Sequence, residues 1–295
     1  PPRSTLFPYT TLFRSIGGKF PRTESGRYYS PRDKKGNLLA NVCLCSRKDL
    51  RESVVAARSA FGGWSTRSAF NRSQILYRIA EMMEGRRTQF IDELIKQGAT
   101  ASAAKKEVDL AVDRLVYYSG WCDKFQQVFS SVNPVNSSHF NFSVPEPTGV
   151  VGLLADEKTS LAGLVSGIAA LVAGGNTVIA LASESKPLCA VTFSEVIATS
   201  DVPGGVINIL TGSKKELLEH FGSHMDINAV VYQGNSNEEL SQLRSLASNN
   251  VKRISSYDKD WMDTAQQDPY FIMDAQEIKT TWHPIENIGS EGSGY

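Results

Sequence analysis

The stretch GVVGLLADEKTSLAGLVSGIAALVAGGNTVIAL occupies residues 149–181 and decides the fold. A short apolar run, GVVGLL, is followed by a glycine-closed apolar segment of helical length and then by a second short run, NTVIAL. Short apolar strands that alternate with helices predict a parallel sheet with helices on both faces. The turn after the first strand places Asp156, Glu157 and Lys158 in a row, so it is either a chemical site or the remnant of one.

The same alternation continues to residue 257. Strand-like runs recur at GGVINIL (204–210), INAVVY (227–232) and VKRISSY (251–257), with helical segments between them. Upstream, three stretches between residues 47 and 125 have apolar residues at helical spacing, and residues 137–147 alternate with a period of two. We therefore predict an α/β fold: a Rossmann-like parallel sheet preceded by N-terminal helices and one β segment.

Composition narrows the class of protein. Lys plus Arg and Asp plus Glu are equal at 31 each, so no global field attracts the chain to nucleic acid. The 4 cysteines form no CxxC pair, which favours a reducing, cytoplasmic setting and ordinary core thiols. The longest apolar run, residues 161–173, is too short to span a bilayer.

The first fifteen residues, PPRSTLFPYTTLFRS, differ in character from the rest of the chain. They repeat TLF and contain no initiator methionine. We interpret them as translated linker or adapter sequence, with a native disordered tail as the alternative, and leave residues 1–15 out of the fold argument. We expect the natural N-terminus to lie upstream.

From about residue 16 to residue 260 the chain resembles the aldehyde dehydrogenase superfamily. The resemblance rests on IGGKF, AARSAFGGW, EPTGVVG, GGNTVIA and PGGVINILTG, which follow the family pattern in order and spacing. Among the subfamilies it is most similar to the second, shortened module of the double-module family 16 proteins. The family reaction is attack of a cysteine thiolate on an aldehyde, followed by hydride transfer to NAD(P).

The resemblance implies that the catalytic positions of this chain are vestigial. Lys158 stands where the family has its oxyanion-stabilising Asn, and we expect it to be solvated or ion-paired rather than preorganised. Tyr257 stands where the family has its general-base Glu, and the neighbouring Asp258 is one position off. No Cys follows Tyr257, so no nucleophile is present at the family position. We explain the charged turn at residues 156–160 by solvent where substrate and cofactor pack in the family.

The cofactor positions are also changed. Leu181 replaces a Lys that holds the adenosine ribose in the family, whereas Glu184 is kept. The family's glycine turn keeps Gly234, followed by Asn235, but its last glycine is Glu239, which adds negative charge where a pyrophosphate would lie. The resemblance therefore implies NAD as the cofactor, bound weakly or not at all, through Glu184, Gly234 and Asn235.

The end of the chain resembles the family's oligomerisation strand. DAQEIKTTWHPIE (274–286) matches a strand that pairs in the family with the equivalent of HFNFSVPEP (139–147) and forms the flap through which subunits associate. The resemblance implies a cofactor-like domain over residues 16–267, a C-terminal oligomerisation strand and disordered tail over 268–295, and no catalytic domain. The implied partners are a second copy of the chain, an upstream aldehyde dehydrogenase module, or both.

Three functions remain open from sequence. The favoured one is a catalytically silent module with a scaffolding or dimerisation role. The alternatives are a nucleotide-binding regulatory module, and an oxidoreductase active only together with a catalytic module of the same full-length protein. His220 and His224 are four residues apart, but no third ligand is evident, so we predict no metal site.

Overall fold

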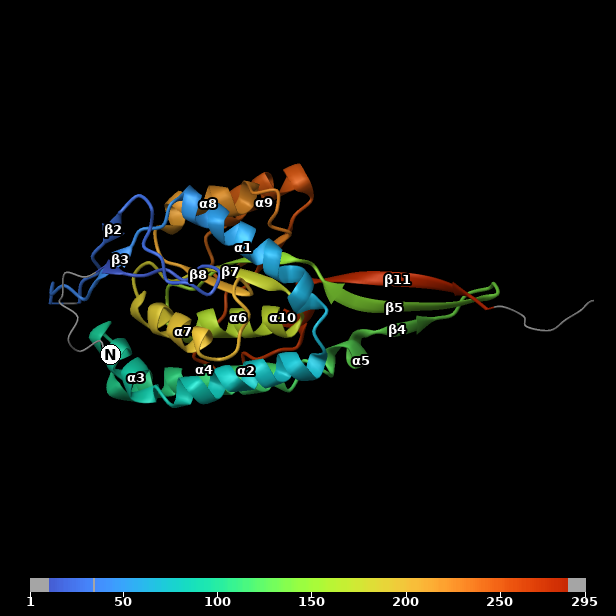
Figure 1. Ribbon diagram of the computed structural model, residues 1–295, viewed down its shortest axis with the longest axis horizontal. Helices are drawn as coiled ribbons and strands as arrows, with labels where there is room; N and C mark the ends of the chain where they lie inside the picture. The colour runs from blue at the N-terminus through green and yellow to red at the C-terminus, as the bar shows by residue number, and fades with distance from the viewer. Residues whose placement is uncertain (1–10, 34, 286–295) are drawn as a thin grey trace, which may run out of the picture.

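A five-stranded parallel sheet lies at the centre of the computed structural model, which describes residues 11–33 and 35–285 (Figure 1). The strands lie side by side in the order β10–β9–β6–β7–β8. They are β6 (Val150–Leu154), β7 (Thr177–Leu181), β8 (Ile207–Leu210), β9 (Ala229–Tyr232) and β10 (Arg253–Ser256). The predicted α/β class and parallel sheet are confirmed.

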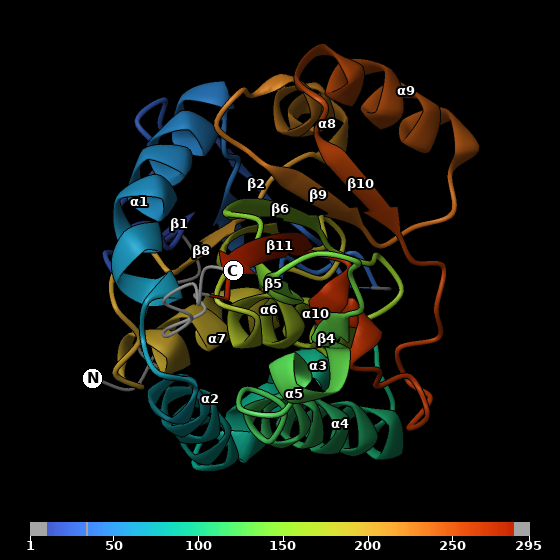
Figure 2. The same ribbon diagram turned by 90° about the vertical axis from the view of Figure 1, so that its right-hand side faces the viewer.

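Helices cover both faces of this sheet (Figure 2). One layer contains α1 (Arg47–Ser65), α8 (Lys214–Ser223), α9 (Asn237–Ala247) and the short η2 (Ser248–Asn250). The other contains α2 (Ala69–Glu84), α3 (Arg87–Lys96), α4 (Ala101–Ser119), α6 (Ala162–Ala173), α7 (Leu188–Ala198) and α10 (Tyr270–Met273). Alternate residues of one strand enter opposite layers: Val178 packs in one apolar cluster and Ile179 in the other. Both faces are thus buried over β6, β7, β8 and β9, which explains their apolar sequences, whereas the edge strand β10 is partly exposed.

A three-stranded antiparallel arm extends from this body (Figure 1). It follows the short helix α5 (Phe125–Phe129) and consists of β4 (Ser131–Asn133), β5 (His139–Pro147) and β11 (Gln276–Pro284). The β5–β11 ladder runs from Gln276 opposite Pro147 to Pro284 opposite His139. The expected pairing of the C-terminal strand with residues 139–147 is therefore present.

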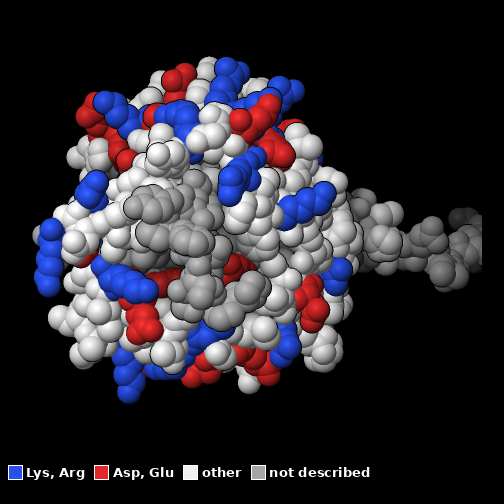
Figure 3. Space-filling view, turned by 60° about the vertical axis from the view of Figure 1, so that its left-hand side comes forward, with Lys and Arg blue, Asp and Glu red and all other residues white. Residues whose placement is uncertain are grey.

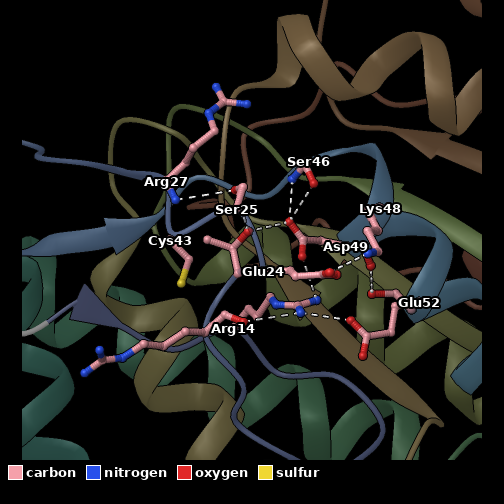
Figure 4. A network of polar contacts seen from close by, with 12 residues as sticks. Arg14, Glu24, Ser25, Arg27, Cys43, Ser46, Lys48, Asp49 and Glu52 are labelled. Atoms are coloured by element: carbon pink, nitrogen blue, oxygen red, sulfur yellow. Dashed lines mark hydrogen bonds and ion pairs between the residues drawn. The ribbon is translucent and has the colours of Figure 1, made fainter.

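A third, small sheet lies near the start of the described chain. It contains β1 (Thr11–Leu12), β2 (Tyr28–Tyr29) and β3 (Asn41–Cys43). Residues 11–15, which we left out of the fold on composition, contact the body: Arg14 is buried and lies 3.1 Å from Asp49 and 2.8 Å from Glu52 of α1 (Figure 4). The Asp49 carboxylate also accepts the Ser46 backbone N–H at 2.6 Å, which caps α1. Residues 1–10 lie outside the described part of the chain.

Candidate functional site

The residues singled out by sequence all follow strands of the parallel sheet. Lys158 follows β6, Glu184 follows β7, Gly234 and Asn235 follow β9, and Tyr257 follows β10. The carboxyl ends of parallel strands share one edge of the sheet, so these loops gather there. The strand order reverses between β6 and β9, which is the place where α/β sheets of this type bind ligands.

A side chain bridges this crevice. The Gln233 Oε1 accepts the Asp156 backbone N–H at 3.1 Å, and its Nε2 donates to the Gly163 carbonyl at 2.9 Å. Gln233 is buried and follows β9, whereas both of its partners follow β6. The loops on either side of the crevice are thus joined by hydrogen bonds within the chain.

The charged turn after β6 is ordered by its own side chains. Asp156 is buried, and its Oδ2 accepts the Thr159 N–H at 2.8 Å and the Thr159 hydroxyl at 3.0 Å. The Thr159 hydroxyl in turn accepts the Gly163 N–H at 3.1 Å. Our interpretation of residues 156–160 as a solvated turn is wrong, since Lys158 alone is exposed and Glu157 is partly buried.

The N-terminus of α6 is occupied by a carboxylate from another helix. Glu107 of α4 is 6% exposed, and its Oε1 accepts the backbone N–H groups of Ser160, Leu161 and Ala162 at 2.9, 2.7 and 3.2 Å. These amides would otherwise lack intrahelical partners and could bind an anionic ligand. Glu107 takes that role from within the chain.

Lys158 and Tyr257, the two positions that we predicted to be vestigial, each contact an Asp side chain. Lys158 is exposed and lies 3.2 Å from the Asp258 carboxylate, as an ion pair that raises the pKa of Lys158. The Tyr257 hydroxyl donates to the Asp274 carboxylate, and its ring packs on Trp261 and Phe271. Burial raises the pKa of Tyr257 well above its usual value, so it stays protonated. Lys158 is thus ion-paired, and the vestigial character of its position stays a prediction.

The Tyr232 side chain fills the space inside the turn that precedes α9. The Tyr232 hydroxyl donates to the Glu239 carboxylate at 2.5 Å and accepts the Ser236 N–H at 3.3 Å. A Cβ on Gly234 would lie 2.6 Å from that hydroxyl, so the glycine is needed for this packing. Burial, and then the bond to Glu239, raises the pKa of Tyr232 to about 12. Asn235 is exposed.

A groove of about 670 Å³ lies beside these loops, and Glu157, Glu184 and Glu239 are among the side chains that line it. The Glu184 carboxylate accepts the Lys214 N–H at 3.2 Å, at the start of α8. The Lys214 ammonium lies 3.5 Å from Glu239. Glu157 accepts the Glu184 N–H at 3.0 Å. Glu184 and Glu239 thus line one groove, but the chain's own groups already engage them.

All four thiols of the chain are buried and free of disulfides. Burial raises the pKa of Cys45 and of Cys122 to about 12, and it also raises the pKa values of Cys43 and Cys189. A buried thiol of raised pKa holds its proton at neutral pH and is a poor nucleophile. The prediction of ordinary core thiols is confirmed.

Neither a metal site nor a membrane span is indicated over the described residues. Within residues 11–33 and 35–285, no group of three or more His, Cys, Asp or Glu side chains is placed to hold a metal ion. Over the same residues, none of the helices combines the length and the apolar character that a membrane crossing requires. On the face in Figure 3, basic and acidic side chains are interspersed.

Sequence reasoning missed Glu107, Gln233 and the pairing of Tyr232 with Glu239. Glu107 lies in mid-helix in α4 and comes close to α6 only through the tertiary fold, so no local signal marks it. Gln233 is likewise a polar residue at a strand end. The Ser236–Glu239 spacing of a capping box was visible, but the carboxylate bonds Tyr232 rather than the backbone of Ser236.

Comparison with known proteins gives one family. A sequence model described as "Aldehyde dehydrogenase family" matches residues 21–257. The cytosolic 10-formyltetrahydrofolate dehydrogenase of Pongo abelii is 32% identical over 251 residues, which are 81% of this chain and 27% of that protein. The putative aldehyde dehydrogenase DhaS of Bacillus subtilis (strain 168) is 30% identical over 245 residues, 81% of this chain and 49% of that protein.

Solved structures agree on the fold. An aldehyde dehydrogenase from Bacillus cereus, determined as an NAD+ complex, superposes with a TM-score of 0.80 at 24% identity. The superposition covers 87% of this chain and 52% of that one. The chain therefore spans about half or less of the length of the proteins that it matches.

Proposed function

The chain belongs to the aldehyde dehydrogenase family, and from this premise we propose that it is a catalytically silent module that serves as a scaffold by associating through its arm. Family membership supports NAD(P)-dependent aldehyde oxidation as the family reaction. We divide the chain into a body over residues 16–267, to which residues 11–15 are joined through β1 and Arg14, and a C-terminal arm strand within residues 268–295. Free buried thiols favour a cytoplasmic setting.

The main support for catalytic silence is the burial of all four cysteines. Thioester formation needs a thiolate that an aldehyde can reach. Each of the four thiols is buried, and burial holds each one protonated. The position of the oxyanion donor holds Lys158, whose ammonium is paired with Asp258 in solvent. A flexible exposed ion pair does not provide the preorganised donor that stabilises an oxyanion.

We expect weak or absent NAD binding because of the side chains at the carboxyl edge of the parallel sheet. The pyrophosphate of a dinucleotide needs free amides at a helix N-terminus. Glu107 accepts the first amides of α6, and Glu239 adds a negative charge to the first turn of α9. Leu181, at the ribose position, is buried and has no polar group. The residues present do not fit the cofactor, so we derive no step through it.

Association is supported by the exposed apolar side chains of the arm. Val132 is 67% exposed, Phe140 45%, Ile278 55% and Trp282 57%. Residues paired across an antiparallel ladder share a face. Trp282 pairs with Asn141 and therefore shares its face. Phe140 is next to Asn141 along β5, so Phe140 and Trp282 lie on opposite faces of the arm. Strand β11 also ends the sheet order, which leaves one edge open to another strand. We propose a second copy of the chain as the partner.

Sedimentation velocity tests this proposal. The wild-type chain should sediment as a dimer at micromolar concentration. Phe140→Ser and Trp282→Ser each probe one face of the arm, and the variant that alters the interface should weaken the dimer by about tenfold or more. Phe70→Ser is the matched control, because Phe70 is 68% exposed on α2, outside the arm. A wild-type monomer, or a dimer unaffected by both arm variants, would contradict association through the arm.

The two alternatives make different predictions. A nucleotide-binding regulatory module requires saturable binding of NAD or NADP in the groove beside Glu184. An oxidoreductase that depends on an upstream aldehyde dehydrogenase module requires NADH formation when that module is supplied. In that case turnover should persist when Cys43, Cys45, Cys122 and Cys189 are replaced, since the nucleophile then comes from the other module.

A further inference from the structure

A second pocket, of about 430 Å³, lies between α1 and α8. Its lining contains none of the loops at the carboxyl edge of the sheet. It is formed by Arg47, Leu50, Arg51, Glu219, His220, Ser223, His224 and Met225. A volume of this size suits a small organic ligand.

Basic groups dominate the lining. Arg47 and Arg51 are four residues apart on α1, so they share one side of the helix. His220 and His224 are four residues apart on α8 and at its end. Glu219 is the one carboxylate among the lining residues. The pocket is therefore able to concentrate positive charge opposite an anion.

A further cation lies next to the pocket, and the nearby carboxylate already has a partner. The Lys252 ammonium donates to the carbonyls of Phe221, Gly222 and His224 at 3.0, 2.8 and 2.9 Å. The Asp226 carboxylate forms an ion pair with Arg58, whose Nε lies 3.4 Å from Asp226 Oδ1. Burial lowers the pKa of His224; Asp226 opposes this shift, whereas Lys252, Arg51 and Arg47 add to it. Lys252 thus adds positive charge behind the pocket, while Arg47 and Arg51 line it.

The hydrogen-bond donors are also defined. The Asp226 backbone N–H donates to His224 Nδ1 at 3.2 Å, so the neutral ring carries its proton on Nε2. That proton is available to a ligand oxygen. Each guanidinium offers a planar fork of N–H groups, which matches the oxygens of a phosphate. Met225, which is 69% exposed, adds an apolar surface beside these donors, and the buried Leu50 lies at the wall of the pocket.

We propose that the α1–α8 pocket is a binding site for a small phosphate monoester carried on an apolar body. Arg47 and Arg51 bind the phosphate oxygens, and the His220 and His224 rings donate from the opposite wall. Met225 contacts the apolar part. A phosphate with three terminal oxygens can accept from both guanidinium groups and an imidazole together, which a carboxylate with two oxygens does less completely.

Proton NMR of the imidazole rings tests the site with phenyl phosphate as the probe. The chain contains 4 histidines. His220 and His224 lie in the pocket, whereas His139 and His283 lie on the arm and serve as internal references. The pocket resonances should shift saturably with millimolar phenyl phosphate, and the arm resonances should not. Inorganic phosphate should bind more weakly, and benzyl alcohol should cause no saturable shift.

Variants then locate the contacts. The double variant Arg47→Gln/Arg51→Gln should weaken phenyl phosphate binding by about tenfold or more. Both arginines are exposed, so the fold should tolerate the change, which circular dichroism checks. Arg78→Gln, an exposed arginine on α2, is the matched control and should bind as the wild type does. Equal shifts of all four histidines, a linear response, or unchanged binding by the double variant would each overturn the proposal.

Discussion

The Tyr232 hydroxyl lies 2.5 Å from the Glu239 carboxylate, at the first turn of α9. Tyr232 ends β9 and Glu239 starts the helix that follows, so the pair closes the turn where a Rossmann-like fold exposes free amides to phosphate. The carboxylate interacts favourably with the helix dipole and repels an anionic ligand. A carboxylate of the chain thus lies in one half of the crevice between β6 and β9.

Glu107 does the same for the other half, and its removal should cost stability. Glu107→Ala leaves three amides of α6 without their acceptor, and we expect the free energy of unfolding to fall by about 3 kcal/mol. Glu107→Gln keeps an acceptor oxygen and should lose less. Urea denaturation measures both. Glu81→Ala, at an exposed helix position, is the control and should change stability by less than about 0.5 kcal/mol. Equal effects of Glu107→Ala and Glu81→Ala would argue against the capping role.

The buried thiols should be unreactive in the folded chain. With the pKa of Cys45 and Cys122 near 12, the thiolate fraction at neutral pH is negligible, and burial excludes the reagent. Titration with an aromatic disulfide should release no chromophore from the native protein and one equivalent per cysteine after denaturation. A single thiol that reacts rapidly in the native state would be a candidate nucleophile and would count against catalytic silence.

Stability should also depend on alkaline pH through Cys45. Its pKa rises from 9.0 unfolded to about 12 folded, so the unfolded chain loses the proton first. The contribution of the thiol is complete below pH 9 and is lost as the pH rises from 9 toward 12. The stability difference between wild type and Cys45→Ala should therefore shrink over that window in urea titrations. A difference that stays constant above pH 9 would show that the thiol is accessible to solvent.

Val251 offers a test of backbone strain. Its φ is 55°, in the left-handed region, and its side chain is 94% exposed. A β-branched residue is disfavoured there, and glycine is not. Val251→Gly should raise the free energy of unfolding by about 1 kcal/mol. Val116→Gly, at an exposed position within α4, should lower it by about the same amount. If both variants are destabilised in thermal melts, Val251 is not strained.

The strand and helix pattern could be predicted from sequence because it depends on local periodicity. The alternation from residue 149 to residue 257 predicted each strand of the parallel sheet, since four of the five strands are buried along their whole length. That no Cys follows Tyr257 in the sequence was likewise visible, because it concerns which residue types are present.

The interior of the turn at residues 156–160 could not be predicted in this way. Its charges suggested solvent, but Asp156 bonds Thr159, and Glu107 reaches the turn from a helix about fifty residues earlier. Arg14 is a similar case. The composition around it suggested linker sequence, but its guanidinium forms a buried ion pair with Asp49. In each case the partner is supplied by the tertiary fold, which a local pattern does not record.

Titration with NAD by isothermal calorimetry measures whether the crevice accepts a dinucleotide. Glu107 accepts the first amides of α6 and Glu239 places a carboxylate in the first turn of α9, so we expect no saturable heat at millimolar NAD or NADP. The Bacillus subtilis relative DhaS serves as a comparison under the same conditions. Saturable binding of NAD to this chain at micromolar concentration would contradict the claim that its own side chains close the crevice.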